Sequence, residues 1–251
     1  WVADGNFTMG SPTTETGRQW AREHEHNVSL INGFYLGKYE VTPAQYEVVM
    51  KGNLEGLSPL PSLWLSNPDH PVEQVSWDDI QIFLARLNNA ELAAGTLPAN
   101  WSYVLPTESQ WEYACRAGTT TAYSWGNTLS STDANWNHGN DANKTVDVGQ
   151  YSANPWGFFD MNGNVWEWCA DWYGTYPIGI TLVNPLGPTS GSDRVNRGGA
   201  WSDDNLDLRS AKRGKLPPSS RYYGPLGFRV GFQQVQPDRA SPELVLSGGA
   251  V

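Results

Sequence analysis

Three groups of side chains in this sequence have types and spacings that could support catalysis or metal binding. His24 and His26 alternate along a predicted strand, where alternate residues share one face, so they could form a metal-binding pair; surface histidines are the simpler interpretation. Asp203, Asp204 and Asp207 could divide acid and base roles if their carboxylates converge. No nucleophile-elbow motif accompanies them.

The third group is a pair of cysteines, Cys115 and Cys169, and the chain has 2 cysteines in all. Two are too few for a disulfide-dense scaffold, and their spacing fits no zinc motif. The even number of cysteines alone leaves two interpretations open, a single disulfide or two free buried thiols.

Capped helices and short strands must position these groups. Helices are predicted over 42–50 and 107–117, because these segments begin with the capping boxes Thr-Pro-x-Gln and Thr-x-x-Gln. Ser76 caps a third predicted helix over 76–87. The stretch 119–158 has no periodicity, which is typical of a segment held by something other than hydrophobic burial, such as a cation. Strands are predicted at 34–36, 40–41, 165–169, 194–197 and 227–232, with one domain over 1–233 and a tail over 234–251.

Composition excludes several classes of protein. The 251 residues include 16 Lys+Arg and 26 Asp+Glu, a formal net charge of -10, which argues against nucleic-acid binding and a polybasic membrane surface. No apolar run approaches the roughly 20 residues of a spanning helix. The acidic balance and the 13 tryptophans favour an exported or cell-surface bacterial protein over a cytoplasmic one. The chain begins at Trp1, so we expect a processed or trimmed form.

Several segments, taken together, resemble the formylglycine-generating enzyme family, also called the sulfatase-modifying factor domain. The resemblance covers residues 6 to about 232. It implies an α+β fold, a modified C-type-lectin-like domain with little regular structure and bound calcium. The segments are Phe7-Thr8-Met9-Gly10-Ser11, Glu40-Val41-Thr42, Val75-Ser76-Trp77-Asp78-Asp79, Leu105-Pro106-Thr107-Glu108, Gly163-Asn164-Val165-Trp166-Glu167-Trp168, Arg197-Gly198-Gly199 and Gly227-Phe228-Arg229.

The copper-binding cysteines of the enzyme branch are missing. In that branch a cysteine pair follows an Arg-Gly-Gly-Ser segment, whereas here residues 197–209 contain no cysteine, Asp203 takes the first thiolate position and Ala200 replaces the serine. A carboxylate cannot replace a thiolate as a ligand for Cu(I), so we do not expect formylglycine synthesis. The resemblance also implies a disulfide from Cys115 to the position of Val230; Cys169 could replace that partner, and two unreactive thiols are the alternative.

The resemblance implies calcium as a cofactor at two sites. Asp160 and Glu167 match side-chain ligands, and Gly163 and Val165 match carbonyl ligands, of the first site; otherwise Asp160 caps a turn and Glu167 pairs with an arginine. A second site would use Asn135, Trp136 and Asp141, and would hold the unpatterned stretch.

The segment 202–224 is rich in Tyr, Ser, Gly, Asn and Asp, which are typical of adaptable recognition surfaces. It resembles the variable stretch of proteins diversified by retroelements; an ordinary solvated loop is the alternative. We therefore predict a non-catalytic protein that binds a peptide, protein or glycan in a cleft over 201–229, or else an enzyme of unknown reaction. The predicted ligand-binding residues are Trp201, Ser202, Asp203, Asp204, Asn205, Asp207, Arg213, Tyr222 and Tyr223.

Overall fold

Three capped helices form where the sequence predicts them. The computed structural model describes residues 1–64, 67–139, 143–221 and 225–235. Helices α1 (Pro43–Met50), α2 (Trp77–Ala93) and α3 (Glu108–Arg116) each begin at a complete capping box. Each box pairs two backbone N–H groups at a helix end reciprocally with side chains, so local sequence fixes where these helices begin.

Within the described residues, the strands form three small sheets. Pairing is antiparallel except between β2 and β6 and between β5 and β9. The first sheet has the order β1 (Gly5–Met9), β2 (His26–Leu30) and β6 (Thr181–Val183). The second has the order β3 (Tyr35–Leu36), β10 (Gly231–Gln234) and β4 (Trp101–Val104). The third has the order β8 (Gly214–Leu216), β7 (Arg194–Arg197), β5 (Trp166–Trp172) and β9 (Leu226–Gly227).

The α+β prediction is confirmed, with two corrections to the strands. The predicted strand 227–232 is broken between β9 and β10, because residues 228–230 leave one sheet before the next begins. Residues 40–41 are not a strand, although the Val41 N–H donates to the carbonyl of Phe228. Between 119 and 158 the described residues hold no helix and no strand beyond one isolated bridge.

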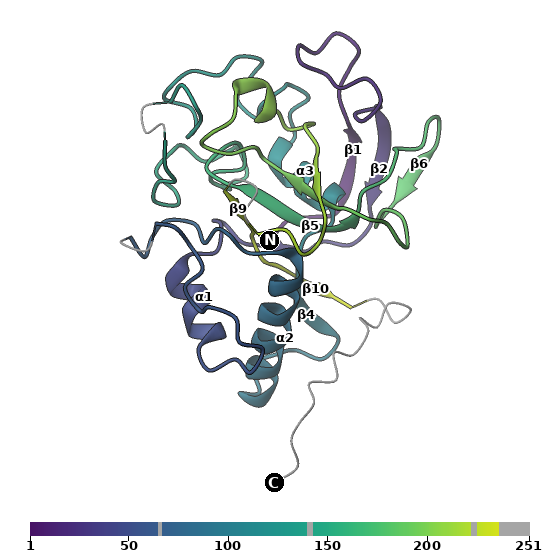
Figure 1. Cartoon of the computed structure of the whole chain (residues 1–251). Coiled ribbons are helices and arrows are strands. Elements are labelled where there is room, and N and C mark those ends of the chain that lie inside the picture. Colours follow the sequence, from purple (N-terminus) through teal and green to yellow (C-terminus); the bar gives the residue numbers. More distant parts are fainter. Residues whose placement is uncertain (65–66, 140–142, 222–224, 236–251) are drawn as a thin grey trace.

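Two hydrophobic cores lie on opposite sides of the central β5 strand. One core packs α1 and α2 through Tyr46, Phe83 and Phe228, and the other packs α3 against β1 and β2 around Trp111. Figure 1 shows α1 and α2 side by side below β5, and β1, β2 and β6 above it. None of the helices in the described part of the chain is long and apolar enough to cross a bilayer.

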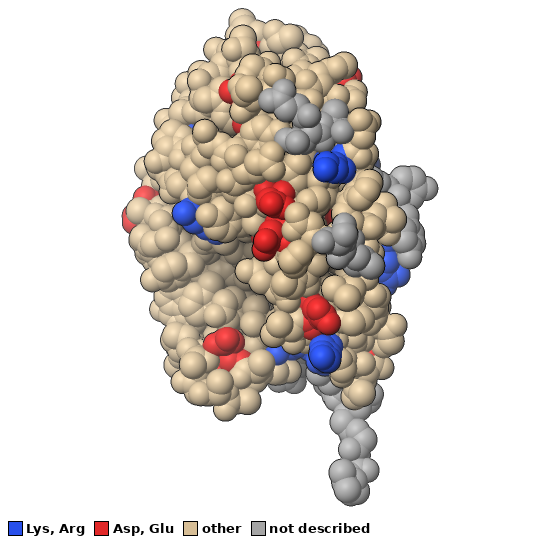
Figure 2. Space-filling model, turned by 90° about the vertical axis from the view of Figure 1, so that its left-hand side faces the viewer, with Lys and Arg blue, Asp and Glu red and all other residues tan. Residues whose placement is uncertain are grey.

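The surface in Figure 2 carries its Lys and Arg side chains as separate groups. A nucleic-acid surface needs a basic patch that can follow a phosphate backbone. The face shown lacks such a patch, and the absence of nucleic-acid binding remains a prediction from the acidic composition.

Candidate functional site

The loop before β5 places the first predicted calcium ligands against the segment around Asn135. Asp160, Gly163 and Asn164 all have left-handed backbone angles, with φ of 55°, 102° and 63°. A Cβ atom on Gly163 would lie 2.3 Å from the Asn135 carbonyl oxygen, so only glycine fits there. The Asn164 N–H donates to the same carbonyl at 3.0 Å, which joins the two segments, and Val165 follows, fully buried.

Glu167 is buried on β5 and its carboxylate is already engaged. Arg229 donates from Nε and from a terminal nitrogen to the two oxygens of Glu167, each at 2.6 Å, and Trp111 Nε1 donates at 2.8 Å. The structure thus contains the arginine pair that was the alternative interpretation of Glu167. A carboxylate offers about four acceptor positions, so one remains for a cation.

Glu40, which no sequence pattern marks as a site residue, joins this cluster from the segment before α1. Its Oε2 accepts from Asn164 Nδ2 at 3.0 Å, and its Oε1 is buried without a partner. Burial, followed by repulsion from Asp160 and Glu167, raises the pKa of Glu40 well above its usual value. Burial likewise raises the pKa of Asp160 to about 6, although its Oδ2 accepts from the Gly149 N–H. Three carboxyl groups therefore share one guanidinium group.

The second predicted calcium site has an unsatisfied oxygen. Asn135 Nδ2 donates to the Lys144 carbonyl at 2.9 Å and to Asn164 Oδ1 at 3.2 Å, while Asn135 Oδ1 is buried without a partner. Trp136 lies beside it, and Asp141 lies outside the described residues. An orphaned amide oxygen fits a calcium ligand. No three His, Cys, Asp or Glu side chains of the described residues converge as a metal site, so carbonyl and amide oxygens would have to complete either one.

The segment after Gly199 is divided between exposed and buried residues. Ser202 and Asp204 are exposed, whereas Trp201, Asn205 and Asp207 are half-buried. The Asn205 carbonyl accepts from the Tyr123 hydroxyl at 2.6 Å. Tyr222 and Tyr223 lie outside the described residues, so the structure places only part of the predicted binding surface.

The three aspartates of this segment do not form a converging set. Asp203 Oδ2 accepts from Trp166 Nε1 at 2.6 Å and from the Ala200 N–H at 2.9 Å, and burial raises its pKa. Asp207 pairs with Lys212 at 2.5 Å, while Asp204 only precedes a short 3-10 helix, η1 (Asn205–Asp207). Asp203 therefore holds a turn together through its Oδ2 atom.

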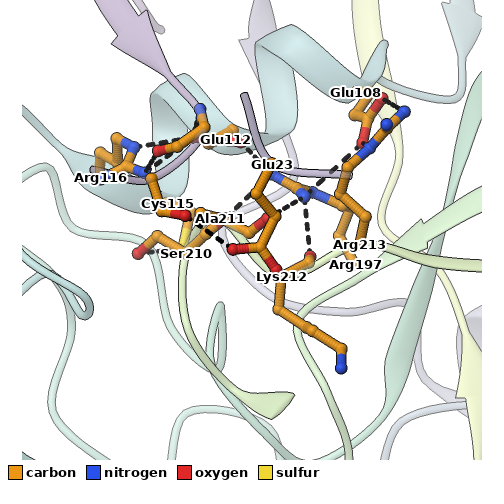
Figure 3. Close-up of polar contacts among 12 residues, drawn as sticks. Glu23, Glu108, Glu112, Cys115, Arg116, Arg197, Ser210, Ala211, Lys212 and Arg213 are labelled. Atoms are coloured by element: carbon orange, nitrogen blue, oxygen red, sulfur yellow. Dashed lines mark hydrogen bonds and ion pairs between the residues drawn. The ribbon is translucent and has the colours of Figure 1, made fainter. Parts of the chain in front are cut away.

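Arg213, predicted to bind ligand, is instead part of the buried framework. It donates to both oxygens of Glu108, at 2.6 and 2.7 Å, and its guanidinium group lies 3.8 Å from the Tyr176 ring centroid. Figure 3 shows Arg213 pointing toward Glu108 at the start of α3, and Arg197 beside it reaching Glu112 and the 210–212 carbonyls. Burial alone would raise the pKa of Glu108, but Arg213 and Arg197 hold this pKa below its usual value.

Cys115 and Cys169 are both free and buried in the structure, so the predicted disulfide is corrected to two separate thiols. Cys115 Sγ lies 3.4 Å from Ser210 Oγ, and Val230, the position that implied a partner, packs in the other core. Burial raises the pKa of Cys115 to about 11 and that of Cys169 well above its usual value. Neither thiol is therefore activated as a nucleophile.

The histidine pair does not form a metal site in the described structure. His26 begins β2 with its ring 4.5 Å from that of Tyr176, and its Nδ1 lies 2.9 Å from the His24 carbonyl oxygen. His24 precedes the strand, so the two rings do not share one strand face.

The sequence relationship extends over most of the chain. The family described as Sulfatase-modifying factor enzyme 1-like domain matches residues 1–233. The chain belongs to this family. It is similar to the formylglycine-generating enzyme of Bos taurus, 32% identical over 66% of this chain and 44% of that protein. It is also similar to that of Streptomyces coelicolor, 36% identical over 64% of this chain and 52% of that protein. The chain thus spans about half the length of these relatives.

Solved structures agree with this assignment. The chain matches Treponema denticola variable protein 1 with a TM-score of 0.78 and 25% identity, over 92% of this chain and 93% of that one. It matches PvdO from Pseudomonas aeruginosa with a TM-score of 0.79 and 26% identity, over 92% of each chain. The fold is therefore that of formylglycine-generating-enzyme-like, C-type-lectin-like domains.

Proposed function

We propose that this chain is a non-catalytic recognition protein that binds a peptide, protein or glycan through the exposed part of the segment after Gly199. One observation carries the proposal: exposed and anchoring residues are separated within that segment. Ser202, Asp204 and Leu206 are exposed, whereas Arg209 and Arg213 are buried and paired with carboxylates. Such a segment can change its exposed side chains without losing its anchors, which suits a variable binding surface.

Similarity to a protein named as variable supports the same interpretation. Treponema denticola variable protein 1 aligns with 92% of this chain. The composition of 202–224 suits diversification at adenines, so we propose that the chain is a retroelement-diversified protein with an exported or cell-surface location. A near-repeat of the 3′ coding segment beside a reverse transcriptase gene, differing only at adenines, is the expected genomic observation.

An enzyme of unknown reaction on this scaffold is the weaker hypothesis. Asp203 accepts hydrogen bonds from Trp166 and Ala200, and Asp207 pairs with Lys212, and these contacts favour structural roles for both carboxylates over acid or base roles. The sequence also lacks the thiolates that Cu(I) chemistry needs. We expect no aldehyde product by mass spectrometry when the protein is incubated with copper, oxygen and a cysteine-containing sulfatase peptide.

We also propose that calcium stabilises the scaffold. Asp160 and Glu167 would bind it with Gly163 and Val165, and Asn135 and Trp136 would bind it with Asp141. The excess of buried carboxyl groups and the unpartnered oxygens of Glu40 and Asn135 support this assignment. A bound cation would offset the buried negative charge and pin the 119–158 stretch to β5.

Peptide selection can test the recognition surface. A random peptide library is panned against the immobilised full chain, and enriched peptides are measured against the variant S202A/D204A/L206A. We expect at least a tenfold loss of affinity. The control is N89A/L92A, which changes two exposed residues of α2 on the other side of the molecule. Peptides that bind both variants equally well would contradict the proposed surface.

A further inference from the structure

The outer face of the β1-β2-β6 sheet carries a groove that the proposed function does not use. The groove has a volume of about 400 Å³, within the usual range for small-molecule sites, and six residues from the three strands line it. Four of them present short uncharged polar side chains, namely Asn6, Thr8, Asn27 and Thr181. Figure 1 shows this sheet at one edge of the molecule, away from α1 and α2.

Strand register orders these side chains into rows. Thr8 pairs with Asn27, which pairs with Thr181, so the three form one row across the sheet. Asn6 pairs with Ser29 in the neighbouring row. Adjacent strands lie about 4.8 Å apart, so the row presents hydroxyl, amide and hydroxyl groups at regular intervals.

The four polar side chains that line the groove are free to bind a ligand. Within the part of the chain that the structure describes, none of the side chains of Asn6, Thr8, Asn27 and Thr181 forms a hydrogen bond to another protein group. Asn6, Thr8, Asn27 and Thr181 are all exposed. Hydroxyl and amide groups both donate and accept, which matches a ligand whose own groups do the same.

The same face continues into exposed aliphatic side chains. Val183 pairs with Ser29 in the second row and is 57% exposed, and Ile31, two residues further along the chain from Ser29, is 58% exposed. The Ile31 N–H donates to Asn184 Oδ1, which holds these two apolar residues close together. The face thus combines neutral hydrogen-bonding groups with an apolar border.

We propose that this face is a second binding site, separate from the segment after Gly199, and that it binds a neutral glycan. A sugar presents hydroxyl groups at its edges and C–H groups on its faces, which complement the polar rows and the aliphatic border. Among the residues that the structure describes, no charged side chain lines the groove although the chain has a net charge of -10, so an uncharged ligand fits better than a charged one. A peptide strand would pair with a sheet edge through its backbone, which side chains on a sheet face do not offer.

The test is an NMR titration of the full chain, labelled with nitrogen-15, with four neutral hexasaccharides: xylohexaose, cellohexaose, maltohexaose and mannohexaose. Asn6-Phe7-Thr8 and Asn27-Val28-Ser29 are N-x-S/T sequences, so the host must lack N-glycosylation. We expect saturable shifts for at least one sugar at the backbone amides of Thr8, Asn27 and Thr181 and at the Asn side-chain amides.

Matched variants separate a site from non-specific contact. T8V/T181V removes two hydroxyls from the row and should weaken binding at least tenfold, while valine keeps the strands well formed. T128V removes an exposed hydroxyl from the 119–158 stretch and should leave the affinity unchanged. The proposal is overturned by the absence of saturable shifts in the groove with all four sugars, by unchanged affinity in T8V/T181V, or by tighter binding of a glucuronic-acid oligosaccharide.

Discussion

The two buried charge clusters of this chain differ in their balance. Among the described residues, four carboxylates around α3 face four guanidinium groups, whereas three carboxyl groups around the start of β5 share the single guanidinium group of Arg229. The charges of the first cluster cancel. The second cluster carries an excess of negative charge that a cation or protons must offset. The balanced set consists of Glu15, Glu23, Glu108, Glu112, Arg116, Arg197, Arg209 and Arg213.

Asp171 shows how strictly the first cluster is balanced. This fifth carboxyl is buried beside Glu108 and accepts from the Glu108 N–H at 2.7 Å. Burial, with repulsion from Glu108, raises the pKa of Asp171 to about 7. The balanced cluster therefore accommodates a further carboxyl group only at the expense of its ionisation.

The largest expected effect comes from opening the balanced cluster. Arg213→Met leaves Glu108 buried with Arg197, 3.6 Å away, as its one remaining ion-pair partner among the described residues. Removing one partner of a buried ion pair costs about 3–5 kcal/mol. The control Lys215→Met breaks the more exposed pair with Asp193 and should cost about 0–1 kcal/mol. Urea unfolding measures both, and similar losses for the two variants would refute the assignment of Arg213 to the framework.

Calcium should act on the unbalanced cluster and not on the balanced one. A ligand that binds only the native state adds about 2.7 kcal/mol at 100 times its Kd, so CaCl₂ should raise the melting temperature and EGTA should lower it. Asp160→Asn should abolish most of this response, and without calcium at pH 7 it should be at least as stable as the wild type. The latter follows because an ionised Asp160 is unfavourable in the native state above its pKa of about 6.

The matched control is Glu55→Ala, which removes an exposed carboxylate and should respond to calcium like the wild type. Asn135→Ala tests the second site separately. An unchanged melting temperature on chelation of the wild type, measured by scanning fluorimetry, would count against calcium at either site.

Over a single pH unit, the smallest effect is a change of stability with pH that Asp171 should cause. Because its pKa is raised in the native state, the native protein keeps a proton between about pH 4 and 7 that the unfolded chain has released. Its contribution to stability is therefore lost as pH rises through this window, by at most about 1.4 kcal/mol per pH unit. Asp171→Asn retains an acceptor for the Glu108 N–H and should flatten the dependence in urea unfolding at constant EGTA. Parallel curves for the two proteins would show that Asp171 is ionised throughout.

Local signals made the helices predictable, because a capping box joins residues three positions apart. The lack of the copper-binding cysteines was predictable for the same reason, since their positions fall within one short segment. Arg213 was misassigned because its partner Glu108 lies 105 positions away and nothing near Arg213 in the sequence marks it as buried. Glu40 was missed as a site residue because its neighbours Asp160 and Glu167 come from the other half of the chain.

The ion pairs of Arg209 have a consequence for how the chain is made. Arg209 holds Glu15 and Glu23 across sequence separations of 194 and 186 residues. During translation these two glutamates emerge from the ribosome long before Arg209. The ion pairs beside the β1–β2 hairpin therefore cannot form when the hairpin is first synthesised. Contacts of such long range slow folding and prolong the exposure of unfinished surfaces. The nascent chain can therefore complete these ion pairs only after Arg209 has been synthesised.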